Sequence, residues 1–382
     1  MKVGLLYPKS NAHVNMGIQF INALRKCLTT IHLAEKIQLL PEGIGFGGNE
    51  KEVYKTVEKL LIADGVDVLV AYIDLKVLNL LEPLILASGK IVLVVNAGAN
   101  YPQNWSAQPT TIFLTLQHAF LCWLTGAKAA QSGNKNASLV TSFYDCGYLH
   151  NTATVNNFMA SGGNITYNYV NNQAYNNNFH INELLAFLSS PDNNTENLLC
   201  VLDSTPAHLF YQLLPQLSNA DKLHLFVSPM MLENIALGSF TKPFSIEGFT
   251  PWHVSLTAKS NEDFLQLYAQ QNKQAVNIFT LQGWETGLFL QQLYNAANEN
   301  YNDGEKIVQA LIQQPIASPR GQLFLDEATH YYTAPFVHCK IDANVLTPVF
   351  DVINDYQKDW AAFIAEPVEG VSSGWLNTYL CY

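Results

Sequence analysis

Residues 60–72 read LLIADGVDVLVAY, and this stretch decides the fold. The apolar face of a predicted helix ends at Leu60-Leu61, and Asp64-Gly65 stops the helix. The run Val66–Tyr72 that follows is apolar and has the length of one buried strand. A helix that leads into a strand buried on both faces is typical of a parallel sheet with crossover helices, so the stretch predicts an α/β fold.

The same alternation of strand-length apolar runs and helical periods continues on both sides of this unit. The other strands that we expect in the first 250 residues are Lys2–Tyr7, Ile37–Leu40, Ile91–Ala97, Thr110–Thr115, Ser138–Phe143, Ile165–Val170, Leu198–Asp203, Leu223–Val227 and Ile246–Phe249. Helices lie between them, among them Leu75–Ala87 and His118–Ala130. This order predicts two doubly wound parallel-sheet lobes in tandem.

Beyond Trp252 the pattern becomes helical. Three helices are expected to begin near Ser260, Asn277 and Asp303, with no strand between them. Without strands they cannot form a third sheet, so we expect them to return and cover the first lobe. Two further strands are expected near the end of the chain, at Phe336–Ile341 and Val349–Val352.

The charge balance excludes a nucleic-acid partner. Against 31 acidic residues there are 20 basic ones, a net charge of −11, and only Arg25 and Arg320 are arginines. A nucleic-acid binder needs clustered cations to neutralise phosphates. The longest uncharged stretch, Ile91–Ala127, is interrupted by amides and a proline, so it offers no run of about 20 apolar residues to span a membrane. The six cysteines have no close pair and no metal-ligand spacing, and those in apolar segments are expected to be buried thiols.

Two glycine-rich motifs match a cofactor-binding or a catalytic signature, but the neighbouring elements or residues that each signature requires are missing. Gly43–Gly48 fits G-x-G-x-x-G, but it follows the second strand, and Pro41 and Glu42 separate it from the strand end. We therefore interpret these glycines as a flexible connection, and a dinucleotide-binding loop of an NAD-dependent enzyme stays a distant alternative. Gly370–Gly374 fits G-x-S-x-G, yet no histidine follows it to complete a triad. We expect no enzymatic activity, no cofactor and no metal.

Polar and aromatic residues gather at the carboxyl ends of the expected strands, where open α/β sheets bind ligands. Such a mixture suits a small polar molecule with an apolar portion. The candidate ligand-binding residues in the first lobe are Ser10, Tyr72, Asp74, Gly98, Ala99 and Asn100. Those in the second lobe are Tyr144, Asp145, Asp203, Ser204, Thr205 and Met230.

The order of elements and five strings resemble the type I periplasmic binding proteins, in the branch of the leucine/isoleucine/valine-binding protein of ABC transporters. The strings are Met16–Leu24, Leu60–Val70, Asn96–Asn100, Gly283–Gly287 and Arg320–Asp326. The resemblance implies two lobes joined by three crossings, near Thr110–Leu116, Gly248–His253 and Leu325–Tyr332. It assigns residues 1–113 with 251–328 to the N-terminal lobe, 114–250 with 329–355 to the C-terminal lobe, and 356–382 to a tail.

The resemblance also implies how a ligand is held. The backbone N–H groups of Gly98-Ala99-Asn100 correspond to the loop that binds a ligand carboxylate, but the family's serine is replaced by Leu75. The acid that meets an ammonium group corresponds to Met230, so Asp74, Asp145 or Asp203 would have to take that role. Tyr72, Tyr144 and Trp284 would favour a ligand with a stackable face.

The expected function is capture of a small polar or amphipathic molecule, amino-acid-like or aromatic, in a cleft between the lobes. The partner would be an ABC transporter permease or a sensor, and the protein would be periplasmic or lipid-anchored, with its leader absent from this sequence. A ligand-sensing receptor domain of the same fold is the alternative, and a cytoplasmic location is less favoured. A structure in which the chain's own tail plugs the cleft, or in which the two rims never meet across a shared gap, would end this interpretation.

Overall fold

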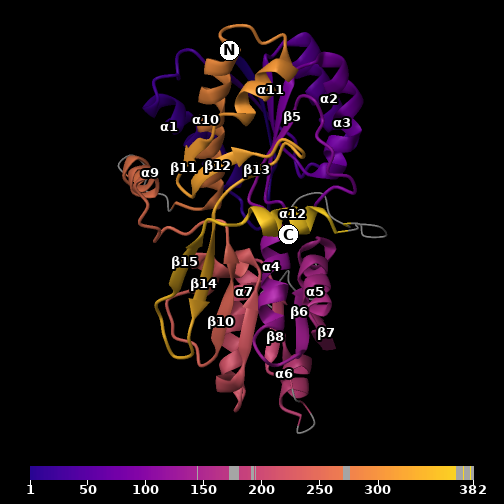
Figure 1. Ribbon diagram of the computed structural model, residues 1–382, viewed down its shortest axis with the longest axis vertical. Coiled ribbons are helices and arrows are strands. Elements are labelled where there is room, and N and C mark those ends of the chain that lie inside the picture. Colours follow the sequence, from indigo (N-terminus) through magenta and orange to yellow (C-terminus); the bar gives the residue numbers. More distant parts are fainter. Residues whose placement is uncertain are drawn as a thin grey trace.

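The structure is a computed structural model of the chain. It describes residues 1–143, 145–171, 180–190, 193, 195–269, 276–366, 373 and 379, without the side chains of Cys146, Ser204, Ile235 and Ala269. Two lobes lie one above the other along the long axis of the molecule (Figure 1). Each lobe is built around its own mostly parallel sheet, as the alternation in the sequence predicts.

The first lobe is centred on a five-stranded parallel sheet of order β2-β1-β3-β4-β5. Its strands are β1 (Lys2–Tyr7), β2 (Gln38–Gly43), β3 (Val68–Tyr72), β4 (Ile91–Asn96) and β5 (Thr111–Thr115). Every residue of β3, β4 and β5 is buried, because helices cover both faces of the sheet. The strand order reverses between β1 and β3, which is where sheets of this kind open a crevice at their carboxyl ends.

Helices from both ends of the chain cover this sheet (Figure 1). They are α1 (Met16–Thr30), α2 (Glu50–Glu58) with the π-helical turn η1 (Lys59–Ala63), α3 (Leu75–Ser88), α9 (Lys259–Ala269), α10 (Ile278–Ala297) and α11 (Gly304–Ile312). Helix α10 packs so closely on α1 that a Cβ atom added to Gly283 would lie 2.2 Å from the carbonyl oxygen of Phe20. The helices that follow Trp252 in the sequence therefore lie with the first sheet.

The second lobe is centred on a seven-stranded sheet of order β15-β14-β10-β9-β8-β6-β7. Its strands are β6 (Asn136–Ser142), β7 (Asn164–Asn171), β8 (Asn197–Val201), β9 (His224–Val227), β10 (Ser245–Thr250), β14 (Phe336–Ile341) and β15 (Val349–Ile353). Strands β6 to β10 are parallel, and β14 and β15 add an antiparallel edge. The helices of this lobe are α4 (His118–Ala130), α5 (His150–Ala160), α6 (Asn182–Leu188), α7 (Ser204–Leu213) and α8 (Asn234–Leu237), with 3-10 turns η2 (Asp145–Gly147), η3 (Leu214–Gln216), η4 (Ala220–Lys222) and η5 (Pro229–Leu232).

The chain passes between the two sheets three times. It leaves the first sheet between β5 and α4, returns after β10, and leaves again between β13 and β14. A three-stranded antiparallel sheet, β11 (Ile316–Ser318), β12 (Gly321–Leu325) and β13 (Tyr332–Thr333), precedes the last passage and was not expected from the sequence. Because β13 pairs with β12, the third passage begins after Thr333, directly beyond the expected Leu325–Tyr332.

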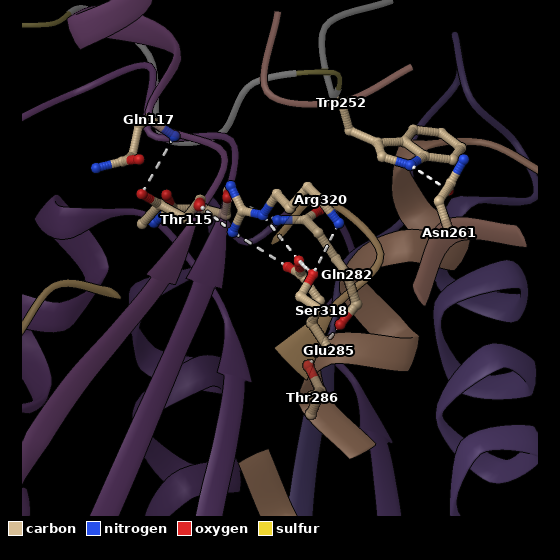
Figure 2. A network of polar contacts seen from close by, with 10 residues as sticks. Thr115, Gln117, Trp252, Asn261, Gln282, Glu285, Thr286, Ser318 and Arg320 are labelled. Atoms are coloured by element: carbon tan, nitrogen blue, oxygen red, sulfur yellow. Dashed lines mark hydrogen bonds and ion pairs between the residues drawn. The ribbon is translucent and has the colours of Figure 1, made fainter. Parts of the chain in front are cut away.

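A buried polar network fastens the first passage to α10 (Figure 2). The guanidinium of Arg320 contacts both carboxylate oxygens of Glu285, at 2.7 Å from Nε and 3.1 Å from Nη2. The same Nη2 donates to the carbonyl of Thr115, the last residue of β5, at 3.1 Å. Ser318 also donates to Glu285. The network thus ties the end of β5 to α10 and to the turn between β11 and β12.

Helix α12 (Gln357–Ile364) lies across the boundary between the lobes (Figure 1). Its Trp360 has ring contacts with Trp105 at 5.4 Å and with Phe120 of α4 at 5.4 Å. Phe363 makes similar contacts with Trp123 of α4. Helix α12 is therefore packed on residues of both lobes. Among the described helices, none is long and apolar enough to cross a membrane.

Candidate functional site

The carboxyl ends of the two sheets face one another, and the loops that follow them touch. His13, after β1, places its Nε2 atom 3.1 Å from Oδ2 of Asp203, after β8. The backbone N–H of Leu149, before α5, donates to the carbonyl of Ala99, after β4, at 3.0 Å. These contacts join the lobes across the cleft that the strand order predicts.

Carboxyl groups line the second-lobe side of this cleft. Oδ2 of Asp145 accepts from the hydroxyl of Ser142 at 2.6 Å and from the backbone N–H of Asp203 at 3.1 Å. Burial, together with the nearby charge of Asp203, raises the pKa of Asp145 to about 7. The same two causes raise the pKa of Glu233, which follows η5, to about 7. The cleft therefore holds three acids close together.

The imidazoles of the cleft have different charge states. Burial lowers the pKa of His13, but the carboxylates of Asp203 and Glu233 outweigh it and raise the value overall. Burial lowers the pKa of His150 to about 3 and that of His118 well below its usual range. Nδ1 of His118 and both ring nitrogens of His150 have no hydrogen-bond partner within the described part of the chain. Two neutral, buried imidazoles are thus available to a bound molecule.

Tyr379, from the tail, lies between the lobes in this cleft. Its hydroxyl donates to Oε1 of Glu233 at 2.9 Å, and its carbonyl accepts from the hydroxyl of Ser10. The ring has edge contacts with His13 at 5.0 Å, Phe279 at 5.3 Å and His118 at 5.9 Å. Only 2% of the residue is exposed. One tyrosine therefore contacts groups of both lobes.

A second part of the boundary is open. A cavity of about 450 Å³ is lined by Asp74, Asn100 and Leu149 among other residues. Oδ2 of Asp74 accepts from the side-chain amide of Asn100 at 3.0 Å, and burial raises the pKa of Asp74 to about 7. The carbonyl oxygen of the Asn100 side chain is buried and has no partner among the described residues. This cavity has room for a small polar molecule.

The structure brings many of the candidate residues to the boundary. Ser10 touches Tyr379, and Asp145 and Asp203 lie in the acidic group. Tyr72 donates to Gln282 at 2.9 Å, and burial with the nearby charge of Glu233 raises its pKa. Met230 is fully buried in the apolar cluster that includes Tyr379.

The Gly98–Asn100 loop differs from the expected anion-binding loop. The backbone N–H of Gly98 donates to the side-chain oxygen of Asn96 at 2.8 Å, so it is already used. Gly98 has φ 68°, and a Cβ atom there would lie 2.8 Å from the backbone nitrogen of Gln117. The carbonyl of Ala99 accepts from Leu149. In this state the loop holds the lobes together.

Other candidates are not brought to the cleft. Trp284 packs on Phe264 at 5.2 Å in the core of the first lobe, because it lies on the buried face of α10. Thr205 is exposed and lies in the first turn of α7, which begins at Ser204. The side chain of Ser204 is not described, and Tyr144 lies outside the described residues.

Sequence reasoning did not identify His13, His118, Glu233 or Tyr379 as residues of this cleft. His13 and Glu233 each follow a parallel strand by a few residues, which is the signal that marked the other candidates. Tyr379 carried no such signal, because it belongs to the tail. Within the described residues, no group of three or more His, Cys, Asp or Glu side chains is placed to hold a metal ion.

The fold and cleft are those of a two-lobed α/β binding protein. Residues 1–344 match the model of a family described as periplasmic binding protein, and the chain belongs to this family. No curated protein matches the chain in sequence.

Solved structures share the fold at low identity. A solute-binding protein of an ABC transporter from R. palustris, in complex with benzoate, has a TM-score of 0.72 at 18% identity, over 93% of this chain and 97% of that one. An ABC transporter substrate-binding protein from Sphaerobacter thermophilus has a TM-score of 0.76 at 14% identity, over 93% and 97%. A leucine-binding protein from Thermotoga maritima has a TM-score of 0.67 at 11% identity, over 94% and 99%.

Proposed function

We propose that this protein captures a small polar or amphipathic solute between its lobes and presents it, outside the cytoplasm, to an ABC transporter. The observation that carries the proposal is a set of buried polar groups that the second lobe directs toward the loops of the first lobe. Three acids lie there, together with two neutral imidazoles whose ring nitrogens include three without a hydrogen-bond partner among the described residues. Buried polar groups without partners are costly, and a bound molecule that supplies hydrogen bonds removes that cost. Proteins of similar fold bind benzoate and leucine by their descriptions, which supports a small organic solute.

Closure of the lobes would signal to the transporter that a solute is bound. The contact between His13 and Asp203 and the bond from Leu149 to Ala99 join opposite lobes, so both are lost when the lobes separate. A solute that touches both lobes binds the closed form better than the open form, and it shifts the population accordingly. A transporter that recognises the closed shape would respond to that shift. A sensor reading the same shape is the second candidate, since closure is identical in both cases.

Tyr379 in the cleft bears on the contrary outcome that the sequence interpretation named, a cleft filled by the tail. The family model matches residues 1–344, and Tyr379 lies outside that range. Tyr379 also belongs to no strand of either sheet. Solute capture then requires that Tyr379 leave the cleft or that the solute occupy the adjoining cavity beside Asp74.

A thermal-shift screen of the full chain tests solute capture. Amino acids, small peptides, aromatic acids and amides would be added singly, and a solute at 100 times its Kd stabilises the folded state by about 2.7 kcal/mol. Asp203→Asn should lose most of the shift. Asp221→Asn, which changes an exposed acid of the same lobe, should keep it. The proposal fails if no solute raises the melting temperature, or if the Asp203 and Asp221 variants respond alike.

A further inference from the structure

Tyr379 contacts the cleft at both of its polar ends. The hydroxyl donates to Glu233 in the second lobe at 2.9 Å, and the carbonyl accepts from Ser10 in the first lobe. Between these ends the ring is enclosed by the edges of His13, Phe279 and His118. Contact with both lobes, through one donor and one acceptor, is what a closure-inducing solute needs.

The acidic groups around the hydroxyl of Tyr379 favour a ligand group that donates a hydrogen bond there. Glu233 accepts from this hydroxyl, Asp203 lies close to Glu233, and Asp145 accepts from the backbone N–H of Asp203. His13 is engaged with Asp203, and the guanidinium of Arg320 is held by Glu285. An aromatic carboxylate placed with its charge at this end would face like charge in a desolvated site. A phenolic hydroxyl supplies the proton that Glu233 accepts.

We infer that the cleft takes a phenol that bears a carbonyl acceptor on the far side of its ring, and that Tyr379 occupies the place of this solute. The inference rests on the proposed function and names its substrate class. The hydroxyl of the solute donates to Glu233, its carbonyl accepts from Ser10, and its ring replaces that of Tyr379 against His13 and Phe279. Binding displaces Tyr379, so the tail competes with the solute for one site.

Two matched probes test the hydroxyl requirement. N-acetyl-tyrosine amide reproduces the ring, hydroxyl and carbonyl of Tyr379 without a net charge, and N-acetyl-phenylalanine amide lacks only the hydroxyl. In isothermal titration of the full chain, the tyrosine probe should bind at least tenfold more tightly than the phenylalanine probe. Glu233→Leu should abolish this preference, and Glu233→Gln, whose amide oxygen still accepts, should retain part of it. Equal affinity for the two probes overturns the inference.

Two further measurements distinguish displacement of the Tyr379 side chain by the probe from simple occupation of the space that Tyr379→Ala leaves empty. Tyr379→Ala should bind the tyrosine probe at least tenfold more tightly than the wild type, because the competitor is gone. In the wild type, saturation with the probe should raise the nitration of Tyr379 by tetranitromethane, measured by peptide mass spectrometry. If Tyr379→Ala binds the probe and the wild type shows neither binding nor increased nitration at millimolar probe, Tyr379 is a structural side chain and the inference is wrong.

The proposed function has a separate outcome in the same assay. If Tyr379→Ala binds leucine or another non-phenolic solute and ignores the tyrosine probe, solute capture stands and the phenol assignment falls. If Tyr379→Ala binds neither the probes nor any solute of the screen, both proposals fail.

Discussion

Arg320 and Glu285 form a two-point ion pair whose side chains are 1% and 0% exposed. The pair lies where β5 leaves the first sheet, since Arg320 also donates to the carbonyl of Thr115. The neighbouring residue Gln282 donates to the carbonyl of Asn96 at 2.7 Å and accepts from Tyr72. Two sets of buried polar contacts from α10 thus reach the ends of the neighbouring strands β5 and β4, and Figure 2 shows the one that includes Arg320 and Thr115.

Removal of the Glu285 charge should destabilise the protein strongly. Glu285→Gln leaves the guanidinium of Arg320 buried without its counter-charge, and loss of one partner of a buried pair costs about 3–5 kcal/mol. Urea denaturation followed by circular dichroism measures the loss. Asp263→Asn breaks the exposed pair with Lys259 and should change the midpoint little. Similar midpoints for the two variants would show that the buried pair does not stabilise the fold.

Loss of the His13 imidazole should shift the lobes toward an open arrangement. His13→Ala removes the side-chain contact with Asp203 and a ring contact with Tyr379. Small-angle scattering should give a larger radius of gyration for this variant than for the wild type without solute. His180→Ala changes an exposed histidine and serves as the control. An unchanged radius in His13→Ala would mean that the contact does not hold the lobes together.

Stability should fall as the pH rises from about 6.5 to 8, since below pH 6.5 the lowered pKa values of His118 and His150 act in the opposite direction. Asp74, Asp145 and Glu233 have pKa values raised to about 7 in the folded state, against about 4 when unfolded. The folded state therefore binds more protons in that window, and the free energy of unfolding decreases with pH, on the order of 1 kcal/mol or more for each group. The raised pKa of His13 acts in the same direction. Its stabilisation of the folded state is fully present at pH values below the pKa of the unfolded chain, and it is lost as the pH rises through the pKa of the folded state.

Calorimetry at constant ionic strength from pH 6.5 to pH 8 checks this dependence. The melting temperature should decline across that range. Asp145→Asn, which imitates the protonated acid, should flatten part of the slope. A melting temperature that rises between pH 6.5 and pH 8 would contradict the assigned shifts.

The contact between α1 and α10 should not accept a methyl group. Gly283→Ala would place its Cβ atom 2.2 Å from the carbonyl oxygen of Phe20, and relief of such overpacking costs about 1–3 kcal/mol. Asn295→Ala, at an exposed position of the same helix, should stay within about 0.5 kcal/mol of the wild type. Thermal unfolding of both variants makes the comparison. Equal melting temperatures would show that the helices can separate at no cost.

The fold could be predicted from sequence because its signals are local and repeated. Strand β4 is a run of five apolar residues followed by Asn96, and α4 begins and ends at the predicted residues His118 and Ala130. The short strands β11 and β13 were missed because runs of three and two residues have no measurable period. Cys27, Cys122 and Cys200 are buried free thiols, as their apolar surroundings predict.

The candidate site could be predicted only where a residue follows a strand directly. Asp145 and Asp203 come close together because β6 and β8 are neighbours, which the topology implies. Trp284 was assigned to the site because it lies in a string that resembles the family. Which side of its helix faces the core depends on tertiary packing, and Trp284 lies in the core. The position of Tyr379 depends on contacts with residues more than a hundred positions away, and no local pattern encodes it.

The aromatic packing of α12 gives the molecule an internal optical reporter. Trp360 touches Trp105 on the side of the first lobe and Phe120 on the side of the second, and the indole N–H of Trp123 donates to Glu366 at 2.6 Å. Rotation of one lobe against the other changes the surroundings of these indoles. Their intrinsic emission should therefore follow opening and closing directly, without an attached dye.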